Sequence, residues 1–350
     1  MTAADGPGPE SAKLFIIDAK GRMRHLARTE LVSLFSPGDL IVANDAATLP
    51  ASLRGLHVAS GELIEVRLAA WIAVRDPTRF VAIALGAGDH RMPTELRPHP
   101  PSISPGDRLS LGPLVAVVED LLGHPRVLAL RFVGDRRAIL AGLAGHGRPI
   151  QYAHVREPLA LWRVWTRIAA DPVAFEAPSA GFALNWRTLA AWRERRIGFS
   201  TLTHVAGISS TGDPALDLRL PFDEPYHVPE RTVAAIKQTK SQGGRIIAIG
   251  TTVVRALGSV VDANGRVHAG DGVARGRIAR ETPLRLVDAI LTGVHQPGES
   301  HFELLRAFAD DSVLNRMSMV LAEHSYRPHE FGDSVLIERQ PRGLPHRMHR

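Results

Sequence analysis

The sequence predicts an α/β domain built on a mixed sheet, into which a small all-β barrel domain is inserted. Short apolar runs alternate with helical patterns in most of the chain, as they do in α/β sheets. Between about residues 59 and 144, short strands separated by Pro- and Gly-rich turns follow one another without a good helix, which is typical of a barrel or sandwich. We therefore expect a discontinuous main domain at 11–58 and 145–338, the barrel at 59–144, and flexible tails at 1–10 and 339–350.

The stretch around residue 250 contains the clearest α/β unit. A helix that includes Glu230 in its first turn should stop at Gly243 and Gly244. The run 245–249 has the pattern of a strand buried on both faces, and Gly250 allows a tight turn into a second helix. Ligands of such sheets gather at the carboxyl ends of strands, which places three side chains to line a pocket: Thr251, Thr252 and Arg255. The alternative, given equal weight, is that the threonines cap the helix and the arginine faces solvent.

The remaining elements follow from local patterns along the chain. Strands are expected at 13–18, 40–43, 63–68, 80–85, 114–118, 126–133, 201–205 and 284–291, and the fold is expected to close with 331–337. Helices are expected at 29–35, 157–170, 185–196 and 302–308. The middle two helices carry tryptophans among arginines: Trp162, Trp165, Trp186 and Trp192. Such side chains can stack on RNA bases, but Trp at helical spacing more often faces a core, and we favour the core.

Composition narrows the class of protein. The chain has 350 residues, enough for two domains, a net charge of +6 and no cysteine, which excludes disulfides, thiolate nucleophiles and iron–sulfur clusters. No tight His/carboxylate pair predicts a metal site, and no long apolar run predicts a membrane span. The N-terminus has no signal-peptide pattern, so we expect a cytoplasmic protein. We also expect a monomer. Arginine carries nearly all the positive charge, which agrees only weakly with an RNA partner.

Several motifs, in order, resemble the S-adenosylmethionine:tRNA ribosyltransferase-isomerase family of queuosine biosynthesis. They span about residues 11 to 338 and include 37–45 (PGDLIVAND), 177–181 (APSAG), 203–205 (THV), Glu224, 243–252 with Arg255, Thr292 with His295 and Pro297, and 326–327 (YR) with 331–333 (FGD). The resemblance implies a mixed α/β domain interrupted by a β-barrel. It also implies transfer and isomerisation of the ribosyl group of S-adenosylmethionine onto a 7-aminomethyl-7-deazaguanine base in tRNA, which gives epoxyqueuosine. No cofactor is needed, because S-adenosylmethionine is itself the co-substrate.

The resemblance also implies the site residues. The reaction needs a base to remove a proton beside the sulfonium, an acid to help adenine leave, and anionic groups to hold a cation. The implied catalytic residues are Asp45, Glu224, His295 and Asp333. Of these, His295 would transfer protons, and the two aspartates would hold the sulfonium or the ribose hydroxyls. The implied substrate-binding residues are Asn44, Thr251, Thr252, Arg255, His204, Thr292, Tyr326 and Arg327. For each histidine a structural role is about as good an explanation, and for each carboxylate a cap or turn is the rival.

The chain departs from the family pattern at positions that bear on function. Ala46 and Ala47 replace Thr-Arg after Asn-Asp, Phe222 replaces a His, and Gly293 replaces an Asn. We therefore keep three hypotheses: the family reaction on tRNA, an enzyme of the same fold that uses S-adenosylmethionine with another acceptor, and a nucleotide- or RNA-binding protein without turnover.

Overall fold

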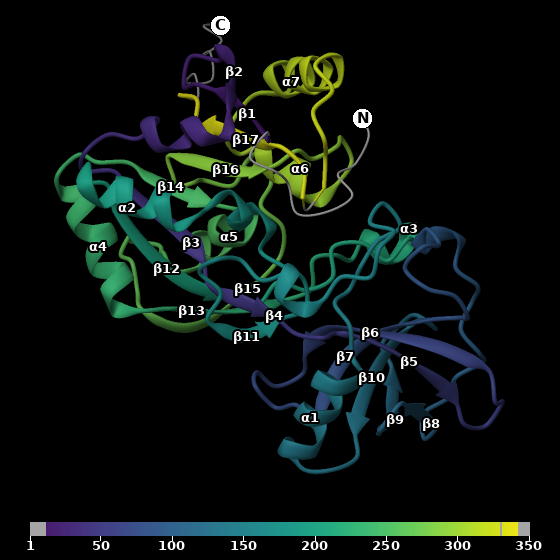
Figure 1. Ribbon diagram of the computed structural model, residues 1–350. Helices are drawn as coiled ribbons and strands as arrows, with labels where there is room; N and C mark the ends of the chain where they lie inside the picture. The colour runs from purple at the N-terminus through teal and green to yellow at the C-terminus, as the bar shows by residue number, and fades with distance from the viewer. Residues whose placement is uncertain (1–11, 330, 342–350) are drawn as a thin grey trace, which may run out of the picture.

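The computed structural model describes residues 12–329 and 331–341, and shows an α/β part beside a β-barrel (Figure 1). Within these residues one sheet has nine strands in the order β15-β13-β12-β3-β14-β16-β17-β1-β2. Its strands are β1 (Lys13–Ile17), β2 (Met23–Ala27), β3 (Leu40–Asn44), β12 (Gly198–His204), β13 (Glu224–Val228), β14 (Ile246–Ile249), β15 (Gly270–Ala274), β16 (Ala289–Gly293) and β17 (Ser334–Glu338). The sequence-based prediction of a mixed sheet with a small barrel is confirmed.

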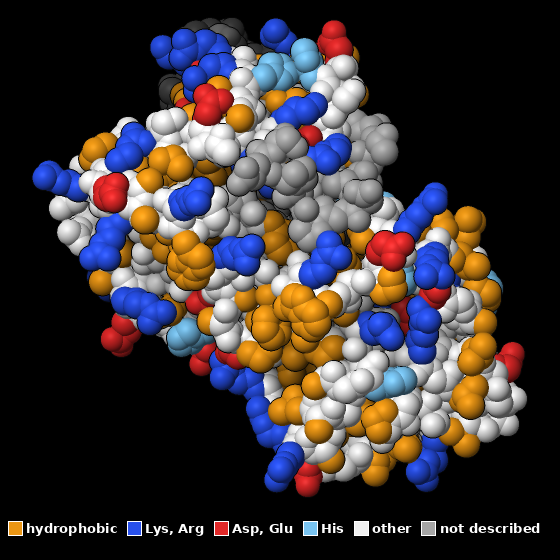
Figure 2. All heavy atoms as spheres, in the orientation of Figure 1, with side chains coloured by type: hydrophobic (Ala, Val, Ile, Leu, Met, Phe, Trp, Pro, Cys, Tyr) orange, Lys and Arg blue, Asp and Glu red, His pale blue; other side chains and the backbone are white. Residues whose placement is uncertain are grey.

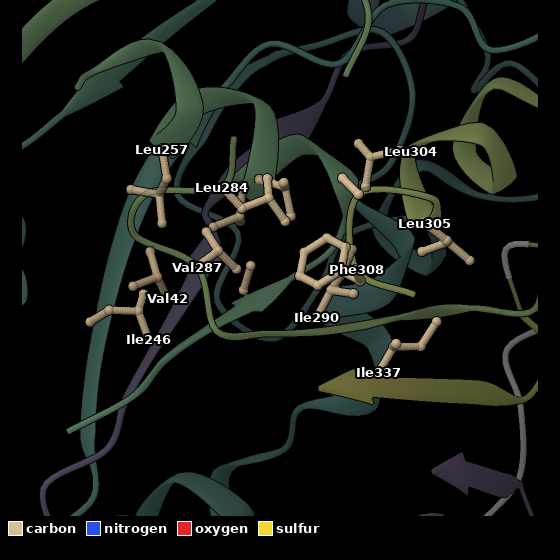
Figure 3. Close-up of a cluster of buried hydrophobic side chains, with 14 of the residues drawn as sticks. Val42, Ile246, Leu257, Leu284, Val287, Ile290, Leu304, Leu305, Phe308 and Ile337 are labelled. Atoms are coloured by element: carbon tan, nitrogen blue, oxygen red, sulfur yellow. The ribbon is translucent and has the colours of Figure 1, made fainter. Parts of the chain in front are cut away.

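Helices cover both faces of this sheet. The longer ones are α2 (Trp186–Glu194), α4 (Glu230–Ser241), α5 (Thr251–Ser259), α6 (Ser300–Leu305) and α7 (Asp311–Glu323), and the short turns are η1 (Arg28–Ser33), η3 (Leu161–Arg163), η4 (Ser179–Ala183) and α3 (Pro214–Asp217). On one face, α4 to α7 bury a cluster that includes Val42, Ile246 and Phe308 (Figure 3). On the other face, Trp192 of α2 packs in a second cluster with Ile247. Each fully buried aliphatic side chain of this kind contributes about 1.5–3 kcal/mol, so both faces of the central strands stabilise the sheet.

The α4–β14–α5 unit agrees with the prediction. The central strand β14 is buried along its whole length and lies parallel to β3 and β16. Gly250 follows it with a φ of 93°, a left-handed conformation that side chains larger than hydrogen rarely adopt. This turn starts α5 directly at the carboxyl edge of the sheet, so Thr251 and Thr252 lie in the first turn of the helix.

The barrel is closed and has the strand order β10-β7-β6-β5-β8-β9. Its strands are β5 (Ser52–His57), β6 (Leu63–Trp71), β7 (Arg79–Leu85), β8 (Arg108–Leu111), β9 (Leu114–Leu121) and β10 (Val127–Phe132), with η2 (Thr94–Leu96) in a connection and α1 (Arg136–His146) after the last strand. The expected start at residue 59 falls after β5, which has no apolar run to reveal it. At Gly55 a Cβ would lie 1.8 Å from the Ser110 oxygen, so the close approach of β5 and β8 requires glycine.

The helix predicted at 157–170 is wrong. Only the single turn η3 forms there, and the chain then runs along β4 (Ala46–Thr48) into β11 (Asp171–Ala174), which pairs with it in parallel. Trp165 donates its indole N–H to the Thr48 carbonyl at 2.9 Å, and the Ala170 N–H bonds to the Asp45 carbonyl. These long-range bonds replace the local helical ones. The strand predicted at 284–291 is likewise shifted, because only its end belongs to β16.

Candidate functional site

A cleft of about 950 Å³ lies between the carboxyl edge of the sheet and the barrel. The barrel side contributes Thr94 and its neighbours from η2, and the sheet side contributes the residues that follow β14 and β16. Loop 206–212 closes the gap between them. Glycines let it approach the barrel backbone, because a Cβ on Gly212 would lie 2.3 Å from the Glu95 nitrogen. The cleft is therefore formed jointly by the two parts of the chain.

Strand direction explains why predicted residues meet in this cleft. β14 and β16 are parallel, so both end at the same edge. β13 is antiparallel to β12 and begins at that edge, which brings its first residue into the same cleft. Six predicted residues line the cleft for this reason: Glu224, Thr251, Thr252, Arg255, Thr292 and His295.

Glu224, Arg255 and His204 form a buried cluster of ionisable side chains at the base of the cleft. Arg255 Nε lies 3.1 Å from Glu224 Oε2, and the Gly207 N–H donates to Glu224 Oε1 at 2.8 Å. Burial raises the pKa of Glu224, although Arg255 and the Gly207 N–H act in the opposite direction. His204 Nε2 lies 3.5 Å from Glu224 Oε2. Burial, reinforced by Arg255, lowers the pKa of His204 to about 3, so this imidazole stays neutral at physiological pH.

Asn44 holds this cluster in place from behind. Its amide nitrogen donates to the His204 carbonyl at 2.8 Å and lies 3.4 Å from Thr252 Oγ1. Its amide oxygen accepts the backbone N–H of His204 at 2.9 Å. Neither Asn44 nor His204 is among the residues that line the cleft. Both predicted binding residues therefore sit one layer below the surface that a ligand would touch.

His295 lies between a hydroxyl and a carboxylate at the mouth of the cleft. Its Nε2 is 2.8 Å from Thr292 Oγ1, and its Nδ1 is 3.7 Å from Glu299 Oε2. Burial opposes ionisation of Glu299, but hydrogen bonding from His295 and from the Gln296 N–H outweighs it and lowers the pKa of Glu299. The carboxylate is thus ionised and favours a proton on Nδ1, which leaves Nε2 as an acceptor.

Several cleft residues were missed by the sequence analysis. Tyr152 donates its hydroxyl to Glu176, and its ring lies under the Arg67 guanidinium at 5.7 Å. Burial, together with the neighbouring Glu176 carboxylate, raises the pKa of Tyr152 well above its usual value. The His154 and His329 rings stack at 4.4 Å in the same cleft. No motif marks these residues, and Glu299, which follows His295 by four residues in the loop before α6, was missed as well.

The other predicted site residues have their contacts outside the set of residues that line the cleft. Asp45 accepts a hydrogen bond from Thr203 Oγ1 at 2.7 Å. The Asp333 carboxylate accepts the backbone N–H groups of Lys13 at 2.7 Å and Arg327 at 2.8 Å. Tyr326 is buried against β1, where its hydroxyl contacts the Leu14 carbonyl. None of the four predicted residues Asp45, Tyr326, Arg327 and Asp333 is among the cleft-lining residues, so their positions support structural roles.

The substituted positions have different surroundings. Ala46 and Ala47 are buried in β4, and Phe222 packs against an apolar cluster on the barrel that includes Ile83. Gly293 lies in the cleft, where a Cβ would meet His329 O at 3.8 Å and His295 Cε1 at 4.0 Å, which are ordinary contacts. Of these four positions, Gly293 is thus the one that lines the cleft, and a larger side chain could begin there without a clash at its Cβ.

In residues 12–329 and 331–341 no cluster of three or more His, Asp or Glu side chains is suited to hold a metal ion. None of the helices in the described part of the chain combines the length and apolar character that crossing a bilayer requires.

Comparison with known proteins places the chain in a family. Residues 3–337 match the family described as queuosine biosynthesis protein. The S-adenosylmethionine:tRNA ribosyltransferase-isomerase of Thermus thermophilus is 30% identical over 345 residues, covering 96% of this chain and 95% of the relative. The Gloeobacter violaceus protein of the same name is 29% identical over 342 residues, covering 94% and 89% of the two chains.

A solved structure has the same fold. The crystal structure of the S-adenosylmethionine tRNA ribosyltransferase from Thermotoga maritima matches with a TM-score of 0.50 and 22% identity, covering 96% of both chains. The chain therefore belongs to the queuosine biosynthesis protein family, an enzyme family whose curated members are named S-adenosylmethionine:tRNA ribosyltransferase-isomerases.

Proposed function

We propose that this protein transfers and isomerises the ribosyl moiety of S-adenosylmethionine onto a 7-aminomethyl-7-deazaguanine base in tRNA, giving epoxyqueuosine and releasing adenine and methionine. The names of the relatives support the reaction class. The structural observation that carries the proposal is the cleft, in which acid, base and cation from three strand ends converge. S-adenosylmethionine acts as a co-substrate, and no further cofactor is part of the proposal.

His295 is proposed as the base that removes a proton beside the sulfonium. An Nε2 acceptor at the mouth of the cleft suits this role, and Glu299 stabilises the imidazolium that forms. Thr292 holds the same nitrogen at 2.8 Å before a substrate arrives. A substrate C–H must therefore displace this hydroxyl or approach beside it.

Glu224 is proposed as the acid that assists the departure of adenine. Its raised pKa keeps the carboxyl protonated to higher pH than an exposed glutamate, which a proton donor requires. Arg255, whose Nη2 donates to the Ala274 carbonyl at 3.0 Å, is held beside it. The arginine and the two hydroxyls at the start of α5 are proposed to anchor the donor carboxylate or a tRNA phosphate.

Incubation with S-adenosylmethionine and tRNA that carries the deazaguanine precursor tests the proposal. Nucleoside mass spectrometry should detect epoxyqueuosine, with adenine and methionine released in equal amounts. A matched reaction with tRNA that carries unmodified guanine at the same position should give no product. Calorimetry with S-adenosylmethionine alone separates the remaining outcomes, because donor binding without tRNA modification would instead favour a different acceptor. No donor binding at millimolar concentration would favour a binding protein without turnover.

A further inference from the structure

Three of the five tryptophans are exposed, which is unusual for so large an apolar side chain. Trp162 on η3 is 74% exposed, Trp186 at the start of α2 is 66% exposed, and Trp165 is 41% exposed. Our expectation that these residues face a core holds only for Trp192, which is fully buried. The other three project from two segments, 161–167 and 186–187, that also carry exposed arginines: Arg163, Arg167 and Arg187.

The two segments belong to one surface. Thr166 of the first segment lies against Gly181 of η4, the turn just before α2. The two residues are so close that a Cβ on Gly181 would lie 2.9 Å from Thr166 Cγ2. Ile168 packs with Leu189 of α2 against the same apolar cluster. We call the surface that carries the three exposed tryptophans and the three arginines the Trp/Arg face.

The arginines of the Trp/Arg face are available for a partner. Within the described residues, the side chains of Arg163, Arg167 and Arg187 make neither a hydrogen bond nor an ion pair, whereas Arg245 is held by Asp39 and Glu338. Figure 2 shows hydrophobic side chains interspersed with Lys and Arg side chains over the side of the molecule on which α2 lies (Figure 1). Exposed aromatic rings among unpaired guanidinium groups are the chemistry that binds single-stranded nucleic acid, because bases stack and phosphates pair.

The Trp/Arg face borders the cleft. Val164, between the tryptophans of the first segment, lines the cleft from inside. Trp165 donates to the carbonyl of Thr48, which is also a cleft residue. Ser179 and Ala180 of η4 line it as well. An RNA strand with one base in the cleft would therefore have its neighbouring bases within reach of the exposed rings.

We propose that the Trp/Arg face is a stacking platform for unpaired bases that flank the base modified in the cleft. This inference rests on the proposed function, since it takes the acceptor to be a tRNA loop. A second copy of this chain fits less well. In a two-fold interface the face would meet itself, bringing unpaired arginines of both copies together.

The test uses the full chain with Trp162 and Trp186 both changed to alanine. Trp165 is left intact, since its hydrogen bond to Thr48 also supports the fold. The matched control is Met319→Ala on α7, which removes a side chain that is likewise 66% exposed. Fluorescence anisotropy with precursor tRNA should show affinity at least tenfold weaker for the double variant than for the control, because each stacked base contributes substantially. Phenylalanine at both positions should restore most of the affinity, and binding of S-adenosylmethionine should not change.

A second probe isolates the role of unpaired bases. When a complementary oligonucleotide pairs the tRNA loop that carries the modified base, the double variant and the control should bind the tRNA equally. The inference is overturned if the double variant binds and modifies tRNA as the control does, while wild type remains active. It is also overturned if the substitutions only convert a dimer to a monomer in sedimentation. If wild type neither binds nor modifies tRNA, the proposed function itself fails and the inference fails with it.

Discussion

Two groups of polar residues occupy the same edge of the sheet but have opposite surroundings. The group at the end of β16, with His295, faces the cleft and contacts other side chains. In the group before β17, Asp333 is only 1% exposed, and its carboxylate accepts hydrogen bonds from two backbone N–H groups. β16 and β17 are adjacent and antiparallel, so Gly293 pairs with Ser334 and the two groups begin almost side by side.

The difference shows what separates a reactive group from a cap. A carboxylate that accepts backbone N–H groups is already committed to holding the chain, and replacing those bonds with substrate contacts would cost stability. A histidine whose partners are side chains can exchange them at little cost. Substitutions in the first group should therefore affect turnover most, and substitutions in the second should affect stability most.

Replacement of His295 by alanine should lower kcat by about 10²- to 10⁴-fold, the usual contribution of a general base. The melting temperature should stay close to that of wild type, because the side chain packs at the mouth of the cleft. Steady-state kinetics and thermal unfolding of the same preparation check both statements. A His295→Ala variant that unfolds readily but keeps its turnover would show that His295 has a structural role and not a catalytic one.

Replacement of Asp333 by alanine should lower the free energy of unfolding by about 2–4 kcal/mol, because two partly buried N–H groups lose their acceptor. The affinity for S-adenosylmethionine should be unchanged under conditions where the variant is folded. Urea unfolding and calorimetry measure the two quantities. Asp333→Asn, which keeps an acceptor oxygen, should lose less stability, and a large loss of donor affinity in either variant would place Asp333 at the substrate after all.

His204 should make stability fall as pH decreases. Its pKa is about 3 in the folded protein and near 6.5 in the unfolded chain, so the unfolded state binds the proton more readily between these values. From pH 7 to pH 5 this histidine should remove about 2 kcal/mol of stability. Urea unfolding of wild type and of His204→Gln at both pH values isolates this effect, since the variant should lose correspondingly less. Equal losses in both proteins would mean that His204 titrates normally.

Glu299→Gln should lower kcat about tenfold with little change in the KM for S-adenosylmethionine, because the amide no longer stabilises a proton on His295. Glu323→Gln, on the exposed side of α7, serves as the control for a lost surface charge. Recovery of part of the activity in Glu299→Asp would support a positioning role. A change confined to KM would instead show that Glu299 contacts the substrate.

Local patterns were sufficient to predict the central sheet but not the barrel boundary. The apolar run of β14, with Gly250 after it, specifies a strand and a turn by itself. β5 has no such run. Its place in the barrel depends instead on Gly55, which allows the close approach to β8. The mistaken helix at 157–170 shows the same limit, because its tryptophans follow helical spacing while hydrogen bonds to Thr48 and Asp45 determine the chain path.

The candidate site was predictable to the extent that strand ends share an edge. This rule brought Thr252, Arg255 and His295 together correctly. It does not state which way a side chain turns, and so it grouped Asp333 with them although that carboxylate accepts the backbone N–H groups of Lys13 and Arg327. Tyr152 lies in a stretch without regular structure, and only tertiary contacts bring it to the cleft.

The position of β17 has a consequence for how the molecule is assembled. β1 has two partners in the sheet: β2, which follows it directly in the sequence, and β17, which is more than 300 residues away. During synthesis the N-terminal hairpin must therefore wait until residue 338 has left the ribosome before it can join the sheet, whereas every barrel strand has emerged by residue 132. Among the described strands, β17 is thus made after all the others, and it holds β1 in the sheet next to β16, the strand that ends at the cleft.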